Sequence, residues 1–247
     1  MRIAVLGISG YQGHYFVRET IDRGHTLIGV ARHASSVKDY YYNDFIKYDA
    51  SGSDYAEMKK IFKDEKVDKV ISVYPPDVLH PWTFPSDMKS LIKACKDSGV
   101  KQLLMMMGGS ANYSRWGNDI NPHDIPSFGQ QVTVGTSYYK YIYDARVEAF
   151  DKEKELDWVI FTPNHLIKYG ERSGKYIYNL DGHGIMYDEH SLNMKDAGAI
   201  NYWDFACAML DTAENPNPEF THKIVSLAWS KEYADEITKK IPVMVNK

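Results

Sequence analysis

The sequence of 247 residues has little of several features that would assign it to a special class of protein. It holds two cysteines, Cys95 and Cys207, which excludes a disulfide framework and a paired-cysteine metal motif. No stretch approaches the roughly 20 apolar residues of a transmembrane helix, and no basic segment with a cleavage site precedes the first apolar run. We therefore expect a cytoplasmic protein without a membrane partner.

A surplus of one charge sign is also absent, because 29 Lys and Arg stand against 33 Asp and Glu along the chain. We therefore expect no nucleic-acid partner, and an anionic ligand must be held by local contacts. The 9 histidines are scattered without an i, i+4 pair, so we predict no metal site. The chain also lacks the G-x-S-x-G motif of a hydrolase nucleophile.

What the sequence contains is an alternation of apolar runs and helical patterns. The expected strands lie at 2–6, 26–31, 45–48, 69–73 and 102–107. Helical patterns separate them at about 13–21, 55–63 and 86–96. This order is typical of α/β proteins with a doubly wound parallel sheet, the Rossmann fold. We predict a single domain over 1–247, with a core at 1–162 and a small C-terminal substrate-side region at 163–247.

The pattern stops between Gly109 and Ser137, where Gly, Pro, Asn and Ser follow one another without periodicity. Loops of this length in a compact domain are usually functional or disordered. Helices are then expected at 139–154, 199–212 and 231–240, and strands at 158–162, 175–178, 192–195 and 222–226. We predict that the C-terminal third forms the second wall of a cleft over the strand ends.

The turn after the first strand has G-x-x-G-x-x-G spacing. Glycines at these positions allow a tight turn, let backbone amides approach a pyrophosphate, and bring the helix close to the strand. The helix N-terminus also attracts an anion through its unpaired amides and its dipole. The residues that we expect to bind a dinucleotide here are Gly7, Ser9, Gly10, Tyr11, Gln12 and Gly13.

Arg32 follows the second strand, where a protein that prefers NAD(H) usually has an acidic residue for the ribose. A guanidinium binds a 2′-phosphate through charge-assisted hydrogen bonds. The alternative is an arginine that is simply solvated at the end of a strand. We predict that NADP(H) is preferred over NAD(H).

Several parts of the chain resemble the NmrA-like branch of the atypical short-chain dehydrogenases/reductases. They are residues 7–13, Arg32, residues 107–110, 157–163 and 173–176, and Asp196. The resemblance implies that the segments after strands four and five lie beside the cofactor, and that the segment after strand six covers the nicotinamide. These positions are Ser72, Val73, Tyr74, Gly108, Gly109, Ser110, Pro163, Asn164 and His165. Asp49 resembles an acidic position near the adenine, or it is a turn residue.

The chain departs from catalytic members of the superfamily in one respect. Their Tyr-x-x-x-Lys pair lies on the helix after strand five, where this chain has Thr136 four residues before Lys140. This chain matches the Tyr-x-x-x-Lys pattern at Tyr55 and Lys59, but these residues lie on an earlier helix. We interpret the match as coincidence. A mechanism that needs a tyrosine proton donor, as in alcohol dehydrogenases or sugar-nucleotide epimerases, is therefore not expected.

Two functions remain open. The first is an NADPH-dependent oxidoreductase that reduces a small flat acceptor, such as a flavin or quinone. Ser110 would donate a hydrogen bond, Tyr113 would stack or donate, and His165 would supply a proton; the alternatives are a turn serine, a packed tyrosine and a satisfied loop histidine. The second is a non-catalytic NADP(H) sensor that binds a partner. The sequence does not indicate the oligomeric state.

Overall fold

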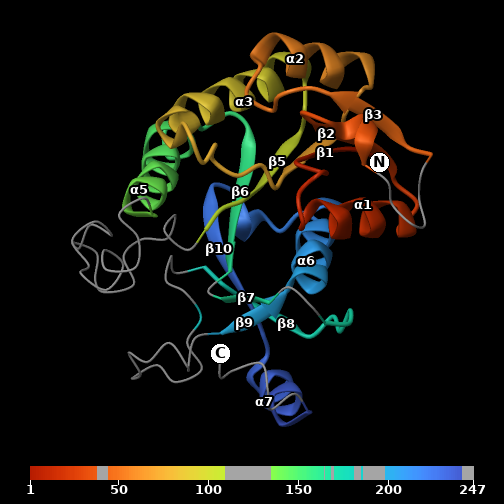
Figure 1. Ribbon diagram of the computed structural model, residues 1–247, viewed down its shortest axis with the longest axis vertical. Helices are drawn as coiled ribbons and strands as arrows, with labels where there is room; N and C mark the ends of the chain where they lie inside the picture. Colours follow the sequence, from red (N-terminus) through yellow and green to blue (C-terminus); the bar gives the residue numbers. More distant parts are fainter. Residues whose placement is uncertain are drawn as a thin grey trace.

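An eight-stranded sheet forms the centre of the molecule, in the order β3-β2-β1-β4-β5-β6-β10-β8 (Figure 1). The computed structural model describes residues 1–37, 44–108, 135–163, 165–167, 170–180, 185 and 198–240. The strands are β1 Arg2–Leu6, β2 Thr26–Ala31, β3 Ile46–Asp49, β4 Lys69–Ser72, β5 Gln102–Met106, β6 Asp157–Pro163, β8 Tyr176–Asn179 and β10 Lys223–Trp229. Neighbouring strands are parallel except for β8, which is antiparallel to β10. The predicted doubly wound sheet is confirmed.

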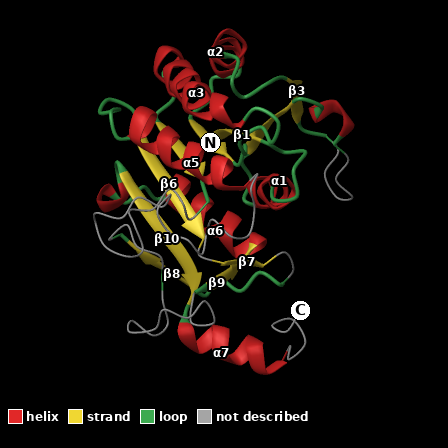
Figure 2. Cartoon of the chain, turned by 60° about the vertical axis from the view of Figure 1, so that its left-hand side comes forward, coloured by secondary structure: helices red, strands yellow, loops and turns green. Residues whose placement is uncertain are grey.

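Helices cover both faces of the sheet. Helices α2, α3 and α5 lie on one side and α1 and α6 on the other, while α7 extends beyond the end of β10 (Figures 1 and 2). The α-helices are α1 Gly13–Asp22, α2 Tyr55–Asp64, α3 Phe84–Ser98, α5 Gly135–Ala145, α6 Tyr202–Glu214 and α7 Lys231–Lys240. Short 3-10 turns are η1 Ala34–Ser36, η2 Pro81–Thr83 and η7 Pro218–Phe220, and η5 Arg146–Phe150 is a π-helix. Among the described residues, no helix has the length and apolar character that crossing a membrane requires.

The continuous apolar strands follow from burial on both faces. In β1, Ala4 and Leu6 belong to the core that contains residues of α2 and α3, whereas Ile3 and Val5 belong to the core that contains residues of α1 and α6. All four side chains are buried. Because successive residues of a strand point to opposite faces, a strand between two helical layers needs apolar residues at every position.

Two predicted helices have different ends in the structure. The helix predicted at 139–154 is α5 followed by η5, and it ends at Phe150. Beyond it, the Glu153 carboxylate accepts hydrogen bonds from the amides of Glu155 and Leu156, at 2.6 and 2.9 Å, and this turn replaces the helix.

The helix predicted at 199–212 begins three residues later. Its first three residues form strand β9 (Ala199–Asn201), which pairs in parallel with β7 (His165–Ile167). Asn201 then caps α6, since its side-chain oxygen accepts from the amide of Asp204 at 2.7 Å. The strand predicted at 192–195 lies outside the described residues.

Candidate dinucleotide site

The glycine turn closes the end of β1 against the start of α1. The Gly7 amide donates to the Val30 carbonyl at 2.8 Å, the Gly10 amide donates to the Gly7 carbonyl at 3.0 Å, and Gly7 has a φ of +94°. A Cβ on Gly13 would lie 2.4 Å from the Gly7 oxygen and 2.5 Å from Ile8 Cα. The turn therefore requires glycine at its first and last positions, for a left-handed backbone and for close packing respectively.

Helix α1 begins in a way that suits an anion. Its N-cap residue, Gln12, makes no side-chain capping bond, and the fully described first turn of α1 has no acidic residue. By contrast, Asp54 caps α2, and Asn201 caps α6 with the acidic Asp204 in its first turn. Ser9, Gly10 and Tyr11, which lead into α1, are exposed. These features fit the pyrophosphate of a dinucleotide, which the α1 amides and dipole would hold.

The turn lies where the strand order reverses. Strand β1 is flanked by β2 on one side and β4 on the other, and in such sheets ligands bind at the carboxyl ends of the strands at this point. The segment after β4 reaches the turn, because a Cβ on Gly7 would lie 3.2 Å from the Val73 carbonyl carbon and from the Tyr74 nitrogen. Ser72 is buried, and its hydroxyl accepts from the Tyr74 amide at 3.4 Å.

The neighbouring strand ends carry further predicted residues. The amide of Met107, which precedes Gly108, donates to the Phe161 carbonyl at 3.0 Å, and Pro163 is the buried last residue of β6. His165 starts β7 and pairs with Ala199; its side chain is not described. The structure thus places several predicted cofactor positions at one edge of the sheet, although their contact with a cofactor stays a prediction. The other predicted residues here lie outside the described ranges: Gly109, Ser110, Tyr113 and Asn164.

Arg32 and Asp49 flank the turn η1. The side chain of Arg32 is 73% exposed, and its guanidinium lies 4.0 Å from the Asp77 carboxylate. Asp49, at the end of β3, accepts from the Ser35 hydroxyl at 2.6 Å and from the Ser35 amide at 2.7 Å, and these bonds lower the pKa of its carboxyl. Asp49 therefore holds η1 in place, and its position near an adenine stays a prediction. Arg32 is open to solvent at the strand end, where a 2′-phosphate would be bound.

A buried carboxylate that the sequence analysis missed anchors the C-terminal region. Asp204 is fully buried and accepts four hydrogen bonds, from the Ser173 amide and hydroxyl, the Gly174 amide and the Trp229 indole, at 2.6 to 2.9 Å. The Asn201 side chain also donates to the Glu171 carbonyl at 2.8 Å. The sequence signal for it is Asn201 three residues before an acid, a pattern typical of the start of a helix.

A second buried carboxylate joins α1 to this region. Glu19 is fully buried and pairs with Arg23 and with Arg172, both at 2.7 Å, while the Trp203 indole donates to it at 3.0 Å. Buried carboxylates are stable only when paired and hydrogen-bonded. Glu19 therefore fixes the cofactor-binding helix relative to α6 and to the segment around 172.

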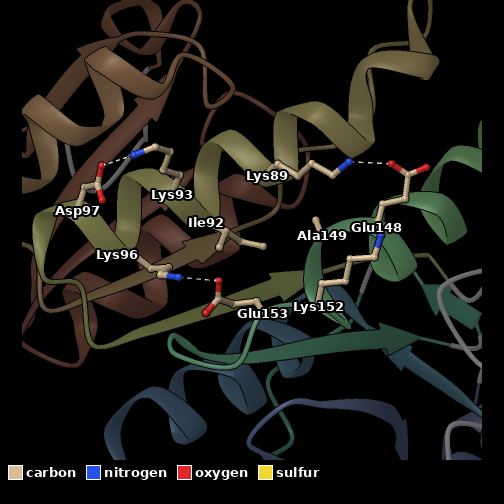
Figure 3. A pocket seen from close by; sticks show the side chains of 9 residues that line it. All are labelled: Lys89, Ile92, Lys93, Lys96, Asp97, Glu148, Ala149, Lys152 and Glu153. Carbon is tan, nitrogen blue, oxygen red and sulfur yellow. Dashed lines mark hydrogen bonds and ion pairs between the residues drawn. The ribbon is translucent and has the colours of Figure 1, made fainter.

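Two other features lie away from the glycine turn. The Tyr55 and Lys59 side chains share a hydrogen bond of 3.1 Å on α2, and the Tyr55 hydroxyl donates to Asp97 of α3, so they belong to a surface ion cluster. A hollow between α3 and η5 is lined by paired charges, including Lys89 with Glu148 (Figure 3). No predicted site residue lines it. Among the residues described, no three His, Cys, Asp or Glu side chains gather as metal ligands.

A Rossmann sheet whose first crossover starts with this turn defines a dinucleotide-binding protein. A model of the NAD(P)H-binding family matches residues 7–216, and the chain belongs to that family. The expected membership of an NAD(P)-binding family is thereby confirmed, and the cofactor is a nicotinamide dinucleotide. The preference for NADP(H) stays a prediction.

Similar proteins share the whole fold. The Bacillus subtilis protein YwnB is 23% identical over 90% of this chain and 97% of its own length. A Bacteroides thetaiotaomicron structure provisionally named an epimerase is 23% identical, with a TM-score of 0.75 over 93% of this chain and 97% of its own. A Streptococcus pneumoniae structure provisionally named an NADH-flavin reductase is 18% identical, with a TM-score of 0.70 over 93% and 100%. At these identities the likeness shows the fold.

Proposed function

We propose that the protein is an NADPH-dependent oxidoreductase that reduces a small flat acceptor, such as a flavin or a quinone. The observation that carries this proposal is the glycine turn at the β1/β4 reversal point, which leads into a helix without a side-chain cap. The family match supplies the dinucleotide, and the provisional name of the Streptococcus pneumoniae relative supports a flavin acceptor. Arg32 supports the phosphorylated form of the cofactor.

The helix after β5 argues against the chemistry of an epimerase. Lys140 lies on α5 and pairs with Asp144, and Thr136 stands where the superfamily's tyrosine would be. Without that tyrosine, a reaction that needs a strong proton donor at a substrate hydroxyl loses its acid. Flavins and quinones do not need one, because their reduced forms take the proton from water or from a weak donor. The chain therefore suits acceptors that need alignment more than acid–base catalysis.

The roles of the protein are to bind, orient and exclude water. When bound, the reduced nicotinamide supplies a hydride, which with one proton reduces the acceptor by two electrons. The turn and the start of α1 would hold the pyrophosphate, and Val73 and Tyr74 would line the space beside it. Asp204 holds the segment after β7 against α6, which would give the acceptor side of the cleft a fixed wall.

The test is a turnover assay with free acceptors. The protein is mixed with NADPH and, in separate reactions, with FMN, riboflavin and a benzoquinone, while the loss of NADPH absorbance is followed. We expect turnover with at least one acceptor and slower turnover when NADH replaces NADPH. Tight NADPH binding without oxidation in any reaction would contradict the proposal.

A non-catalytic NADP(H) sensor is the second candidate, and two observations favour it: Lys140 pairs with Asp144, and the residue four positions before Lys140 is Thr136 instead of tyrosine. A sensor would bind the oxidised and reduced cofactors with different affinities and would not consume NADPH. Calorimetric titration with NADP⁺ and NADPH therefore separates the two functions. Equal affinities together with turnover point to the enzyme.

A further inference from the structure

A row of aromatic rings crosses the seam between α1 and α6. Tyr11 lies in the glycine turn, and its ring centroid is 6.4 Å from that of Tyr202, at the start of α6. Tyr15, one helical turn further along α1, is 5.8 Å from Tyr202 and 6.1 Å from Trp203. The guanidinium of Arg18 covers Trp203 at 4.6 Å. The row therefore begins at the predicted phosphate site and continues into the packed interface between the helices.

Tyr11 differs from the rest of the row in its exposure. It is 57% exposed, whereas Tyr15, Tyr202 and Trp203 are partly buried. An exposed tyrosine ring offers apolar area with a polar tip, which suits contact with a flat ligand. Its backbone is part of the turn predicted to bind the pyrophosphate, so its ring would lie within one side chain's length of the bound cofactor.

Tyr202 connects the same place to the segment after β6. It directly follows Asn201, the last residue of β9, and β9 pairs with the strand that starts at His165. The segment after β6, which would cover the nicotinamide, is therefore hydrogen-bonded to the residues that lead into Tyr202. Tyr11 and Tyr202 lie at the junction of the predicted cofactor and acceptor surfaces.

We propose that the ring of Tyr11 is a stacking surface for the acceptor, and that Tyr202 supports that ring from the side. This inference rests on the proposed function. The planes of the two rings are tilted by 45°, so a flat molecule that lies on Tyr11 meets Tyr202 obliquely. The electron-rich phenol ring favours an electron-poor, fused-ring acceptor, such as an oxidised isoalloxazine, over a single-ring quinone, which covers less of the surface.

The experiment compares variants of Tyr11 in the full chain. Tyr11→Phe keeps the ring, Tyr11→Leu keeps an apolar side chain without it, and Tyr178→Leu is the control, since it removes a 36% exposed tyrosine from the edge strand β8. For each variant, KM is measured for FMN and for a benzoquinone, and the NADPH Kd is measured by titration. Quenching of FMN fluorescence in the presence of NADP⁺ reports stacking without turnover.

We expect Tyr11→Leu to raise the KM for FMN about tenfold and to abolish the quenching, with the NADPH Kd changed less than about twofold. The KM for the benzoquinone should rise less, Tyr11→Phe should keep the quenching because it keeps the ring, and Tyr178→Leu should behave as wild type. An unchanged KM and undiminished quenching in Tyr11→Leu would overturn the inference, as would an equal loss of NADPH affinity, which would assign the ring to the cofactor. If Tyr11→Leu misfolds, Tyr11→Trp must keep the quenching. Wild-type protein that turns over no acceptor refutes the proposed function instead.

Discussion

At the scale of single residues, we propose that Arg32 sets the preference for NADP(H) over NAD(H). Its side chain is 73% exposed, and its guanidinium lies 4.0 Å from the Asp77 carboxylate, which is too far for a hydrogen bond. Exposed ion pairs at such distances contribute little to the stability of a protein. A 2′-phosphate that binds the guanidinium would therefore replace only this weak pairing with Asp77.

We predict that Arg32→Ala weakens NADPH binding roughly ten- to hundredfold and leaves NADH binding nearly unchanged, because hydrogen bonds to charged groups contribute about 1.5–3 kcal/mol. Titration of cofactor fluorescence measures both affinities. Lys101→Ala, which removes an equally exposed cation that follows α3, is the control and should affect neither. Equal losses of affinity for NADPH and for NADH would show that Arg32 does not bind the 2′-phosphate.

At the scale of elements, three of the four bonds to Asp204 hold the 171–174 segment to the start of α6, and the fourth, from the Trp229 indole, joins β10 to it. We predict that Asp204→Ala lowers the free energy of unfolding by about 3 kcal/mol, because it leaves the buried Trp229 indole and the amides of Ser173 and Gly174 without an acceptor. Urea denaturation followed by circular dichroism measures the change.

Asp235→Ala is the matched control for Asp204→Ala, because Asp235 is exposed on α7 and pairs with Lys231 at 3.4 Å. It should change the free energy of unfolding by less than about 0.5 kcal/mol. Asp204→Asn retains one oxygen acceptor and should fall between the two. A loss as small as that of the control would mean that water replaces the Asp204 bonds.

The elements also show what the sequence alone can predict. The parallel strands of the core were predicted because apolar runs that end in turns mark strands buried on two faces. Strands β7 and β9 were not predicted, because each has only three residues, too few to show a periodic pattern. Their pairing also joins positions that are far apart in the chain. Glu19 was missed for the same reason: its place within α1 looks like that of any surface glutamate, and only folding brings Arg172 and Trp203 to it.

At the scale of the whole molecule, the reactivity of the two cysteine thiols measures global unfolding. Cys95 and Cys207 are buried, and burial raises the pKa of the Cys207 thiol to about 12. We predict that the native protein does not react with an aromatic disulfide reagent at neutral pH, and that two thiols react in denaturant. Ala56→Cys, exposed on α2, should add one thiol that reacts at once. Rapid reaction of the native wild type would contradict the burial of these thiols.

The raised pKa of Cys207 also links stability to pH. The unfolded chain releases the thiol proton near pH 8.5, whereas the folded chain keeps it until about pH 12. The unfolded state thus binds fewer protons in this window. The free energy of unfolding should therefore fall as the pH rises above about 8.5.

The pairing of Glu19 has a consequence for the order in which the protein is made. Trp203, one of its partners, follows it by 184 residues, so for most of its synthesis the growing chain carries α1 with Arg23 as the one partner of Glu19 named above that has already been made. The ribosome must release nearly the entire polypeptide before α1 is fixed against α6. We therefore expect a nascent chain that ends before residue 202 to bind the dinucleotide poorly, although every glycine of the turn has already been made.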